Sequence, residues 1–545
     1  MYPYRQYWHV FPTIELVFGH TMPLQMTNDT QHSSGSRTIY LETFGCQMNE
    51  LDSELVQDQL AALGYKFHSD RGTADVVLFN TCSVREQAEN KVLSRVGELG
   101  VEKNDGREVV VGILGCLPER EGKKLLGKYP QLDFICGPSE LDHLPTMLHN
   151  AVAGERLSAA DRSALQGNRS RRSAALSAAD DNLELLDLAR AFNPDHRRTT
   201  ETSAYVRITR GCNKFCTYCV VPHTRGAEVH RPPDAIVEEC KQLVASGAVE
   251  ITLLGQTVNH YRYTHGVALN EAGREVPQIG PNITAFSKPV DESQRVTTFA
   301  NLLQRIHDEV PEVQRLRFVT SYPKDFGNDI LEVMRDCPRI CNYLHVPAQS
   351  GSNRILKLMN RGYTVQEYLD FIERARTIIP DVEIAGDIIV GFPTETEEDY
   401  EATCALLRKV RFKNNFVFHY SPRPGTVAID RFEDDVPRDD KRRWLNSILA
   451  LGAEISGGVH KEYEGKAVDV FVERLSPKTK KNAGVELMWE SGKVQLSGRT
   501  QGDLICVFDV DSEEEANKLM GTVVQVVVTN SAPLLLQGTI CCHSE

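Results

Sequence analysis

The chain has 545 residues, of which 41% are hydrophobic and 25% are charged, and its net charge is −14. This composition is typical of a globular protein, and the length exceeds what one hydrophobic core usually organises, so two to four domains are expected. The negative charge does not favour a general affinity for nucleic acid, so any RNA contact must use a local basic patch. No apolar run reaches the roughly 20 residues of a membrane-spanning helix, so no membrane partner is expected.

The chain contains 14 cysteines but lacks the features of a disulfide-stabilised secreted protein. Such frameworks belong to small secreted domains, whereas this chain is long and has no clear secretory signal. We therefore expect a reducing compartment in which thiolates are free to bind metal. Residues 1–37 are expected to be a disordered or targeting extension, and their charges, Arg5 and Arg37 against Glu15 and Asp29, leave both interpretations open.

Three stretches near the N-terminus share one layout, in which a β-rich run ends in a cysteine. "RTIYLETFGC" ends at Cys46, "DVVLFNTC" at Cys82 and "VVVGILGC" at Cys116. Helical patterns such as "LDSELVQDQLAALG" lie between them, and strands that alternate with helices predict a parallel sheet. Ligands gather at the carboxyl ends of parallel strands, so the three cysteines are expected to converge. Residues 38–153 are therefore predicted to form an α/β domain.

A segment rich in Ala, Ser, Arg and Asp follows, and residues 154–200 are predicted to be a flexible linker with one short helix at "LELLDLARAF". From 201 to 460, six β-rich runs alternate with helical patterns. Six β/α units predict a partial barrel that carries its function at the carboxyl ends of the strands, and an insertion at about 262–297 is expected on that face. The six runs are "AYVRITRG", "EITLLGQ", "RLRFVTS", "NYLHVPA", "VEIAGDIIVG" and "FVFHYS".

Residues 464–540 contain short strands at close spacing, which predicts a small all-β barrel. The runs are "AVDVFVERL", "VELMWES", "KVQLSGRT", "DLICVFDV" and "TVVQVVVTNS". The tail to residue 545 holds eight Lys or Arg against twelve Asp or Glu, so charge alone does not indicate RNA binding there. The whole chain is thus predicted to be an α/β protein with an N-terminal parallel-sheet domain, a central partial (β/α)6 barrel and a C-terminal β-barrel.

The segment "YVRITRGCNKFCTYCVVPHTRG" places Cys212, Cys216 and Cys219 in a C-x3-C-x2-C motif. Structural zinc usually takes four ligands, and here His223 or His230 would have to complete the site. A set of unliganded thiols is a second alternative. In a third interpretation, a four-iron cluster held by three cysteines leaves one iron open, and an open coordination position is where chemistry can occur.

This motif, at the end of the first strand of a six-unit β/α pattern, resembles that of the radical S-adenosylmethionine enzymes. "ETFGCQMNELDSE", "NTCSVRE" and "GILGCLPER" further resemble the N-terminal domain of the methylthiotransferases. "LLGQTVNHY", "LHVPAQSGSNRILKLMNRGYT", "GDIIVGFPTETEEDY" and "HYSPRPGT" resemble their radical core. The β-rich tail occupies the place of their TRAM domain, an RNA-binding barrel. The resemblance covers about residues 38–538.

The resemblance implies two 4Fe-4S clusters and S-adenosylmethionine as cofactors. In radical enzymes the open iron binds S-adenosylmethionine, and an electron from the cluster cleaves it to a 5′-deoxyadenosyl radical. By position, the C-x3-C-x2-C cysteines would hold this cluster, and the three strand-end cysteines would hold an auxiliary cluster tied to sulfur insertion. The metal-binding residues implied are Cys46, Cys82, Cys116, Cys212, Cys216 and Cys219.

Several polar residues are weaker candidates for binding. Four that lie at or near strand ends are predicted to bind S-adenosylmethionine, with loop capping as the alternative; they are Gln256, Asn259, Ser350 and Asp387. Three basic residues at near-helical spacing could meet tRNA phosphates or form an ordinary solvated face; they are Arg354, Lys357 and Arg361.

"GCQMNELDSE" and "LLGQTVNHY" resemble most the MiaB-like methylthiotransferases, which convert isopentenyladenosine next to the tRNA anticodon to its 2-methylthio derivative. The alternatives are the same chemistry on threonylcarbamoyladenosine in tRNA or on a ribosomal protein, and a non-catalytic iron–sulfur protein that binds RNA or a kinase regulator. The implied partners are tRNA, an electron donor and a sulfur donor. The insertion after Tyr261 resembles the eukaryotic organellar branch, the cyclin-dependent kinase regulatory-subunit-associated proteins, which indicates a mitochondrial location, with the cytoplasm as the alternative.

Overall fold

The computed structural model describes residues 37–154, 157–159, 183–192, 202–280, 295–476 and 493–541. The predicted extension, apart from Arg37, lies outside these ranges, as do most of the predicted linker and the predicted strand "VELMWES". The mitochondrial location therefore stays a prediction. No helix within the described ranges is long and apolar enough to cross a membrane.

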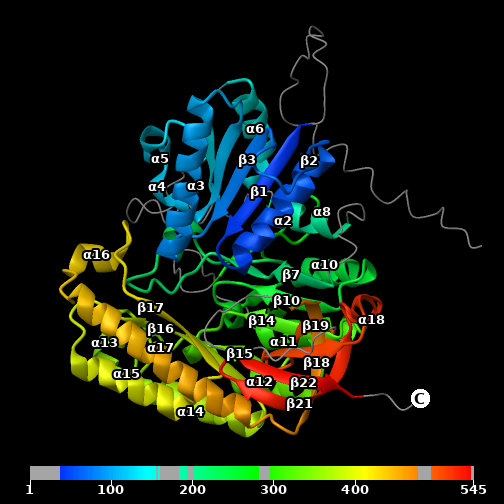
Figure 1. Cartoon of the computed structure of the whole chain (residues 1–545), viewed down its shortest axis with the longest axis vertical. Helices are drawn as coiled ribbons and strands as arrows, with labels where there is room; N and C mark the ends of the chain where they lie inside the picture. The colour runs from blue at the N-terminus through cyan, green and yellow to red at the C-terminus, as the bar shows by residue number, and fades with distance from the viewer. Residues whose placement is uncertain are drawn as a thin grey trace, which may run out of the picture. The chain divides into compact units, whose positions relative to one another are not determined.

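A six-stranded parallel sheet forms the N-terminal domain, in the order β2-β1-β3-β4-β5-β6, and is drawn in blue to cyan in Figure 1. The prediction of a parallel α/β domain is confirmed. The strands are β1 (Thr38–Phe44), β2 (Lys66–Phe67), β3 (Val76–Thr81), β4 (Val110–Gly115), β5 (Phe134–Cys136) and β6 (Leu157–Ala159). The helices are α2 (Gln47–Ala62), α3 (Glu86–Asn104), α4 (Cys116–Glu121), α5 (Lys123–Lys128) and α6 (Leu144–Val152).

The central strand β3 is buried on both faces because helices cover the sheet from both sides. Val76 and Leu78 pack with residues of α2 and α6 in one core, whereas Val77 and Phe79 pack with residues of α3 in another. This alternation follows from the period of two in a strand. A strand of this kind is held firmly, so the residue at its carboxyl end has a fixed position.

The six predicted core strands are all present. They form two three-stranded parallel sheets, β7-β10-β14 and β15-β16-β17, and a parallel bridge between Leu316 and Ile340 joins β14 to the segment before β15. The strands are β7 (Ser203–Arg207), β10 (Glu250–Leu254), β14 (Arg315–Val319), β15 (Tyr343–His345), β16 (Glu383–Val390) and β17 (Asn414–His419). The prediction of a partial barrel is confirmed.

Helices between these strands bury apolar side chains against them in one large core. Three of the helices begin with capping boxes, at Thr298 with Asn301, at Thr364 with Glu367 and at Thr396 with Asp399. The main helices are α10 (Pro233–Ala245), α11 (Phe299–Glu309), α12 (Asn328–Asp336), α14 (Val365–Ile378), α15 (Glu397–Val410) and α17 (Arg438–Lys461). The short elements are β8 (Thr209–Arg210), α9 (Val221–Thr224), β9 (Val229–His230), β11 (Arg262–Thr264), β12 (Gln278–Ile279), β13 (Val296–Thr298), α13 (Asn353–Leu358) and α16 (Val427–Arg431).

The tail forms a closed barrel in the order β18-β19-β20-β22-β21, which confirms the predicted all-β domain. Its elements are β18 (Ala467–Leu475), β19 (Val494–Thr500), β20 (Ile505–Val510), α18 (Glu513–Leu519), β21 (Val523–Ala532) and β22 (Leu535–Ile540). Buried charges attach this barrel to the core. Arg315 and Arg317 of β14 each donate to the Thr500 carbonyl at 2.6 Å, and Lys413 lies 2.7 Å from the Asp503 carboxylate.

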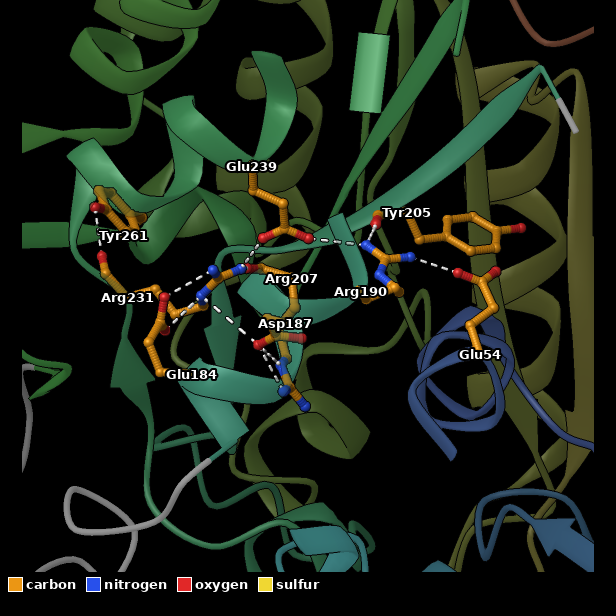
Figure 2. Close-up of polar contacts among 9 residues, drawn as sticks. All are labelled: Glu54, Glu184, Asp187, Arg190, Tyr205, Arg207, Arg231, Glu239 and Tyr261. Atoms are coloured by element: carbon orange, nitrogen blue, oxygen red, sulfur yellow. Dashed lines mark hydrogen bonds and ion pairs between the residues drawn. The ribbon is translucent and has the colours of Figure 1, made fainter. Parts of the chain in front are cut away.

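The helix predicted inside the linker is present as α8 (Leu183–Phe192), and it packs between the N-terminal domain and the core. Its residue Asp187 is 1% exposed and lies 2.7 Å from Arg207 of β7. Arg207 also lies 3.6 Å from Asp52 of α2. The guanidinium of Arg207 is therefore close to two buried carboxylates, one from α8 and one from α2. Figure 2 shows the part of this network that centres on α8.

Further ion pairs extend the network on both sides of α8 (Figure 2). Arg231, which is 1% exposed, lies 2.6 Å from both Glu184 and Glu239. Arg190 of α8 pairs with Glu239 at 2.8 Å and with Glu54 of α2. Because α8 contributes charges to both neighbours, it fixes the N-terminal sheet against the first core strand.

Candidate functional site

The three strand-end cysteines meet at one edge of the N-terminal sheet, as the sequence predicts. Strands β1, β3 and β4 are direct neighbours, and Cys46 precedes α2, Cys82 follows β3 and Cys116 opens α4. The Cys82 side chain hydrogen-bonds with both Cys46 and Cys116. These three residues are called the N-terminal triad below.

The protonation of the N-terminal triad is uneven. Hydrogen bonding with Cys82 lowers the pKa of Cys46 to about 7 and that of Cys116 to about 6. Burial opposes this effect, and the charge of Arg225 supports it. The pKa of Cys82 is raised well above its usual value by the same hydrogen bonds. Two of the three thiols therefore become thiolates readily, as iron ligands must.

Two buried asparagines support this triad, and sequence reasoning did not find them. Asn49 accepts a hydrogen bond from the Cys46 thiol at 3.4 Å, and its side chain donates to Asn80 at 2.9 Å. Asn80 in turn donates to the Asn49 carbonyl at 2.9 Å. The asparagine in "FNTC" could have served as a signal, because an amide inside an otherwise apolar strand needs a partner.

The residue before Cys116 must be glycine. Gly115 has φ +95°, and a Cβ atom there would lie 2.5 Å from both the Thr81 carbonyl oxygen and the Asn80 side chain. Gly115→Ala is therefore expected to lower the free energy of unfolding by about 2 to 4 kcal/mol, from steric overlap and left-handed strain together. Denaturant unfolding of the apoprotein measures this.

The matched control is Gly127→Ala, because Gly127 lies in helix α5 and a Cβ atom there meets nothing within 4 Å. This substitution is expected to leave stability unchanged or to raise it slightly. Equal unfolding midpoints for the two variants would contradict the account of Gly115.

The C-x3-C-x2-C cysteines, called the core triad below, lie in the loop after β7 and β8. The loop turns back at Cys219, whose N–H donates to the Cys216 carbonyl at 3.0 Å. Burial and the nearby charge of Glu228 raise the pKa of Cys212 to about 12. Cys212 also contacts the hydroxyl of Thr257 at 3.7 Å.

Arg361 contacts the core triad directly, which sequence reasoning did not predict. Its guanidinium donates to the Cys216 sulfur at 3.3 Å and to the Pro347 carbonyl at 3.1 Å. The ring of Tyr322 lies 4.7 Å from it and the ring of Tyr363 5.1 Å. Arg361 is therefore placed to stabilise negative charge on the sulfur of Cys216.

One cavity of about 920 Å³ is lined by cysteines of both triads. Cys46 and Cys82 line it from the N-terminal domain, and all three cysteines of the core triad line it from the barrel. Residues of the C-terminal barrel, among them Arg499 and Asp503, line it as well. A molecule held in this cavity can therefore reach both triads.

The four predicted cofactor contacts divide into two pairs. Gln256 and Asp387 line the cavity, and Asp387 lies 3.3 Å from His345. The Asn259 side chain instead bonds both the N–H and the carbonyl of Tyr322, each at 2.8 Å. The Ser350 hydroxyl accepts from the Ser352 N–H at 3.1 Å. Asn259 and Ser350 thus make hydrogen bonds within loops, which was the alternative to binding S-adenosylmethionine. Contact of all four residues with S-adenosylmethionine stays a prediction.

The three predicted phosphate contacts also differ from one another. Arg354 pairs with Asp399 and bonds Thr394, whereas Lys357 is exposed. Arg361 lies beyond the end of α13 and donates to the Cys216 sulfur. The described part of the insertion lies next to the core triad. Its residue Gly280 accepts a hydrogen bond at 3.4 Å from Asn213, which follows Cys212 in the chain.

The donor sets fit iron–sulfur clusters. Within the described residues, no three His, Cys, Asp or Glu side chains are grouped as ligands of a single metal ion. A zinc site needs such a group, whereas a four-iron cluster takes each thiolate on a different iron. Three thiols per triad leave one coordination position for another ligand.

Comparisons with known proteins cover nearly all of the chain. The Radical SAM superfamily matches residues 206–407, and Uncharacterized protein family UPF0004 matches residues 38–137. The tRNA-2-methylthio-N(6)-dimethylallyladenosine synthase of Rhodopirellula baltica is 39% identical over 487 residues, which are 89% of this chain and 93% of that protein. The protein of the same name from Bacteroides thetaiotaomicron is 36% identical over 92% of this chain and 96% of its own.

The chain belongs to the tRNA-2-methylthio-N(6)-dimethylallyladenosine synthase family. This family uses S-adenosylmethionine and two 4Fe-4S clusters, and the two triads remain the predicted sulfur ligands of these clusters. Among solved structures, the radical S-adenosylmethionine methyltransferase TsrM from Kitasatospora setae shares 14% identity with a TM-score of 0.46, over 72% of this chain and 77% of that one.

In this synthase family member, Arg361→Gln is expected to lower the midpoint potential of the cluster on the core triad. The arginine beside Cys216 favours the more negative, reduced cluster, so its loss makes reduction harder. A shift on the order of 50 mV is expected, since 59 mV corresponds to about 1.4 kcal/mol for one electron. A redox titration monitored by electron paramagnetic resonance measures it. Arg354→Gln is the control, and equal potentials in the two variants would contradict this role.

Proposed function

We propose that this protein converts N6-dimethylallyladenosine next to the anticodon of tRNA to its 2-methylthio derivative. The observation that carries the proposal is the single cavity lined by cysteines of both triads. A radical step and a sulfur-transfer step on one carbon atom require both cofactors to reach the same atom. The 39% identity to a synthase of this name over 89% of the chain supports the choice of substrate.

Adenine carbon-2 carries an unactivated C–H bond, and the bound cofactors supply the radical, sulfur and methyl chemistry that replaces its hydrogen. The protein contributes binding, orientation and exclusion of water. The six cysteines would hold the clusters, and Arg361, which donates to the Cys216 sulfur, would stabilise negative charge there. Gln256 and Asp387 offer polar groups to whatever occupies the cavity. Arg225 adds a buried positive charge beside the N-terminal triad.

Anaerobic turnover with a panel of tRNAs tests this function. The reconstituted protein receives S-adenosylmethionine, a reductant and tRNA that carries dimethylallyladenosine, threonylcarbamoyladenosine or unmodified adenosine. Digested RNA is then examined by mass spectrometry. A methylthio group in place of hydrogen is expected only with the dimethylallyl substrate. A product with threonylcarbamoyladenosine alone would overturn the substrate assignment, and no product together with no cleavage of S-adenosylmethionine would overturn the enzymatic one.

A further inference from the structure

The exposed residues that line the cavity define its mouth, and they come from three parts of the chain. Val84 and Arg85 belong to the loop after Cys82, Phe416 belongs to β17, and Arg474 and Leu534 belong to the C-terminal barrel. The other exposed lining residues are Gln47, Ser203 and Ile505. Arg474 is exposed and lines the cavity at this mouth. The mouth therefore combines apolar surface with two exposed guanidinium groups.

Strand β17 supplies two aromatic rings to this mouth. It is an edge strand among the described residues, since it pairs only with β16. Phe416 and Phe418 are two residues apart and both line the cavity, whereas Val417 between them packs on the core. Phe416 is 43% exposed, and its ring meets His345 edge-on at 6.0 Å. Phe418 is half-buried with the Arg85 guanidinium 5.9 Å from its ring.

An exposed phenylalanine on an open strand leaves apolar surface in contact with water, and a ligand that covers the ring removes that surface from water. Leu534 and Ile505 of the C-terminal barrel also line the cavity and are 51% and 39% exposed, so the apolar surface includes residues of that barrel. Flat aromatic faces beside arginines are what single-stranded nucleic acids bind, through base stacking and phosphate contacts. These exposed apolar residues line the same cavity as the cysteines of both triads.

We propose that Phe416 stacks against a nucleobase that flanks the modified adenosine in the single-stranded loop of the tRNA, while Arg85 and Arg474 contact its phosphates. This inference rests on the proposed function and adds a residue that sets substrate binding. The flanking base is the occupant because Phe416 lies at the exposed mouth, whereas the target adenine must pass deeper to reach both triads. Phe418, two residues along β17, lines the same cavity and has the Arg85 guanidinium 5.9 Å from its ring.

The test compares ring-retaining and ring-removing substitutions in the reconstituted holoenzyme. Binding of dimethylallyl-tRNA is measured for the wild type, Phe416→Trp, Phe416→Leu and Phe416→Ala. Removing the ring is expected to weaken binding roughly tenfold, whereas Phe416→Trp binds like the wild type. The KM for tRNA should rise in the same order with kcat changed less. Cleavage of S-adenosylmethionine without RNA should be unaffected.

A second readout locates the base. A tRNA with 2-aminopurine beside the target position should lose fluorescence on binding to the wild type, and this quenching should be absent in Phe416→Leu. Leu449→Ala is the control, because Leu449 of α17 is 47% exposed and lies outside the cavity lining. It should behave like the wild type in every assay.

Different outcomes would contradict the stacking role of Phe416 and the proposed methylthiotransferase function. Equal binding by Phe416→Leu and Phe416→Trp overturns the stacking role, even if Phe416→Ala fails to fold. Quenching retained in Phe416→Leu overturns it as well. A wild-type enzyme that makes no methylthio product on any tRNA overturns the proposed function instead.

Discussion

Cys46→Ala is expected to abolish the methylthio product while the protein still cleaves S-adenosylmethionine, and Cys216→Ala is expected to abolish both activities. The two cysteines belong to different triads, on the N-terminal sheet and in the loop after β8, so each substitution removes a ligand from one cluster only. The measurement is product by mass spectrometry together with 5′-deoxyadenosine by chromatography. Product is expected to fall below detection in both variants.

The matched control for this pair is Cys240→Ala, because Cys240 is a fully buried cysteine in helix α10 that packs in the apolar core. It should retain both activities, with some loss of stability. Equal cleavage of S-adenosylmethionine in Cys216→Ala and the wild type would contradict the assignment of the core triad.

Asp187→Asn is expected to destabilise the protein by about 3 to 5 kcal/mol, because it removes the closest carboxylate from the buried guanidinium of Arg207 and leaves only Asp52, at 3.6 Å, to balance that charge. Asp187 lies 2.7 Å from Arg207 and 3.7 Å from Arg231, and all three are about 1% exposed. Denaturant unfolding measures the loss. Asp439→Asn is the isosteric control, since Asp439 pairs with Arg442 on the exposed surface of α17 and should show no measurable change.

The effect of Asp187→Asn on stability should also depend on pH. Burial raises the pKa of Asp187, but Arg207 and Arg231 outweigh burial and lower it below its usual value. An acid with a lowered pKa contributes stability that is complete above its unfolded pKa, about 3.9, and that is lost as pH falls below it. The difference in stability between the wild type and Asp187→Asn should therefore shrink below about pH 4. A constant difference down to pH 2 would contradict the ion pair.

The cysteine positions could be predicted from sequence because a β-rich run that ends in a cysteine places it at the edge of a parallel sheet. The burial pattern of β3 and the order β1-β3-β4 turn that placement into a meeting of three thiols. The six core strands could also be predicted, because each is a short apolar run between two helical patterns.

Arg361 could not be predicted, because its role depends on where the chain turns. Helical spacing grouped it with Arg354 and Lys357, but α13 ends at Leu358 and the chain then brings Arg361 back to Cys216. The strand β22 was missed because "LLQGTI" follows β21 after a tight turn at Leu534, where φ is +68°. The buried charges of α8 also escaped prediction, since Arg and Asp in a polar segment are typical of a solvated linker.

The iron content of two triple variants tests the central claim, that two separate triads hold two separate clusters around one cavity. The wild type, Cys46→Ala/Cys82→Ala/Cys116→Ala and Cys212→Ala/Cys216→Ala/Cys219→Ala are reconstituted in parallel, and iron and sulfide are assayed per chain. About eight iron atoms are expected in the wild type and about four in each variant, with distinct electron paramagnetic resonance signals. Loss of all iron in one folded variant, or of none, would contradict the account.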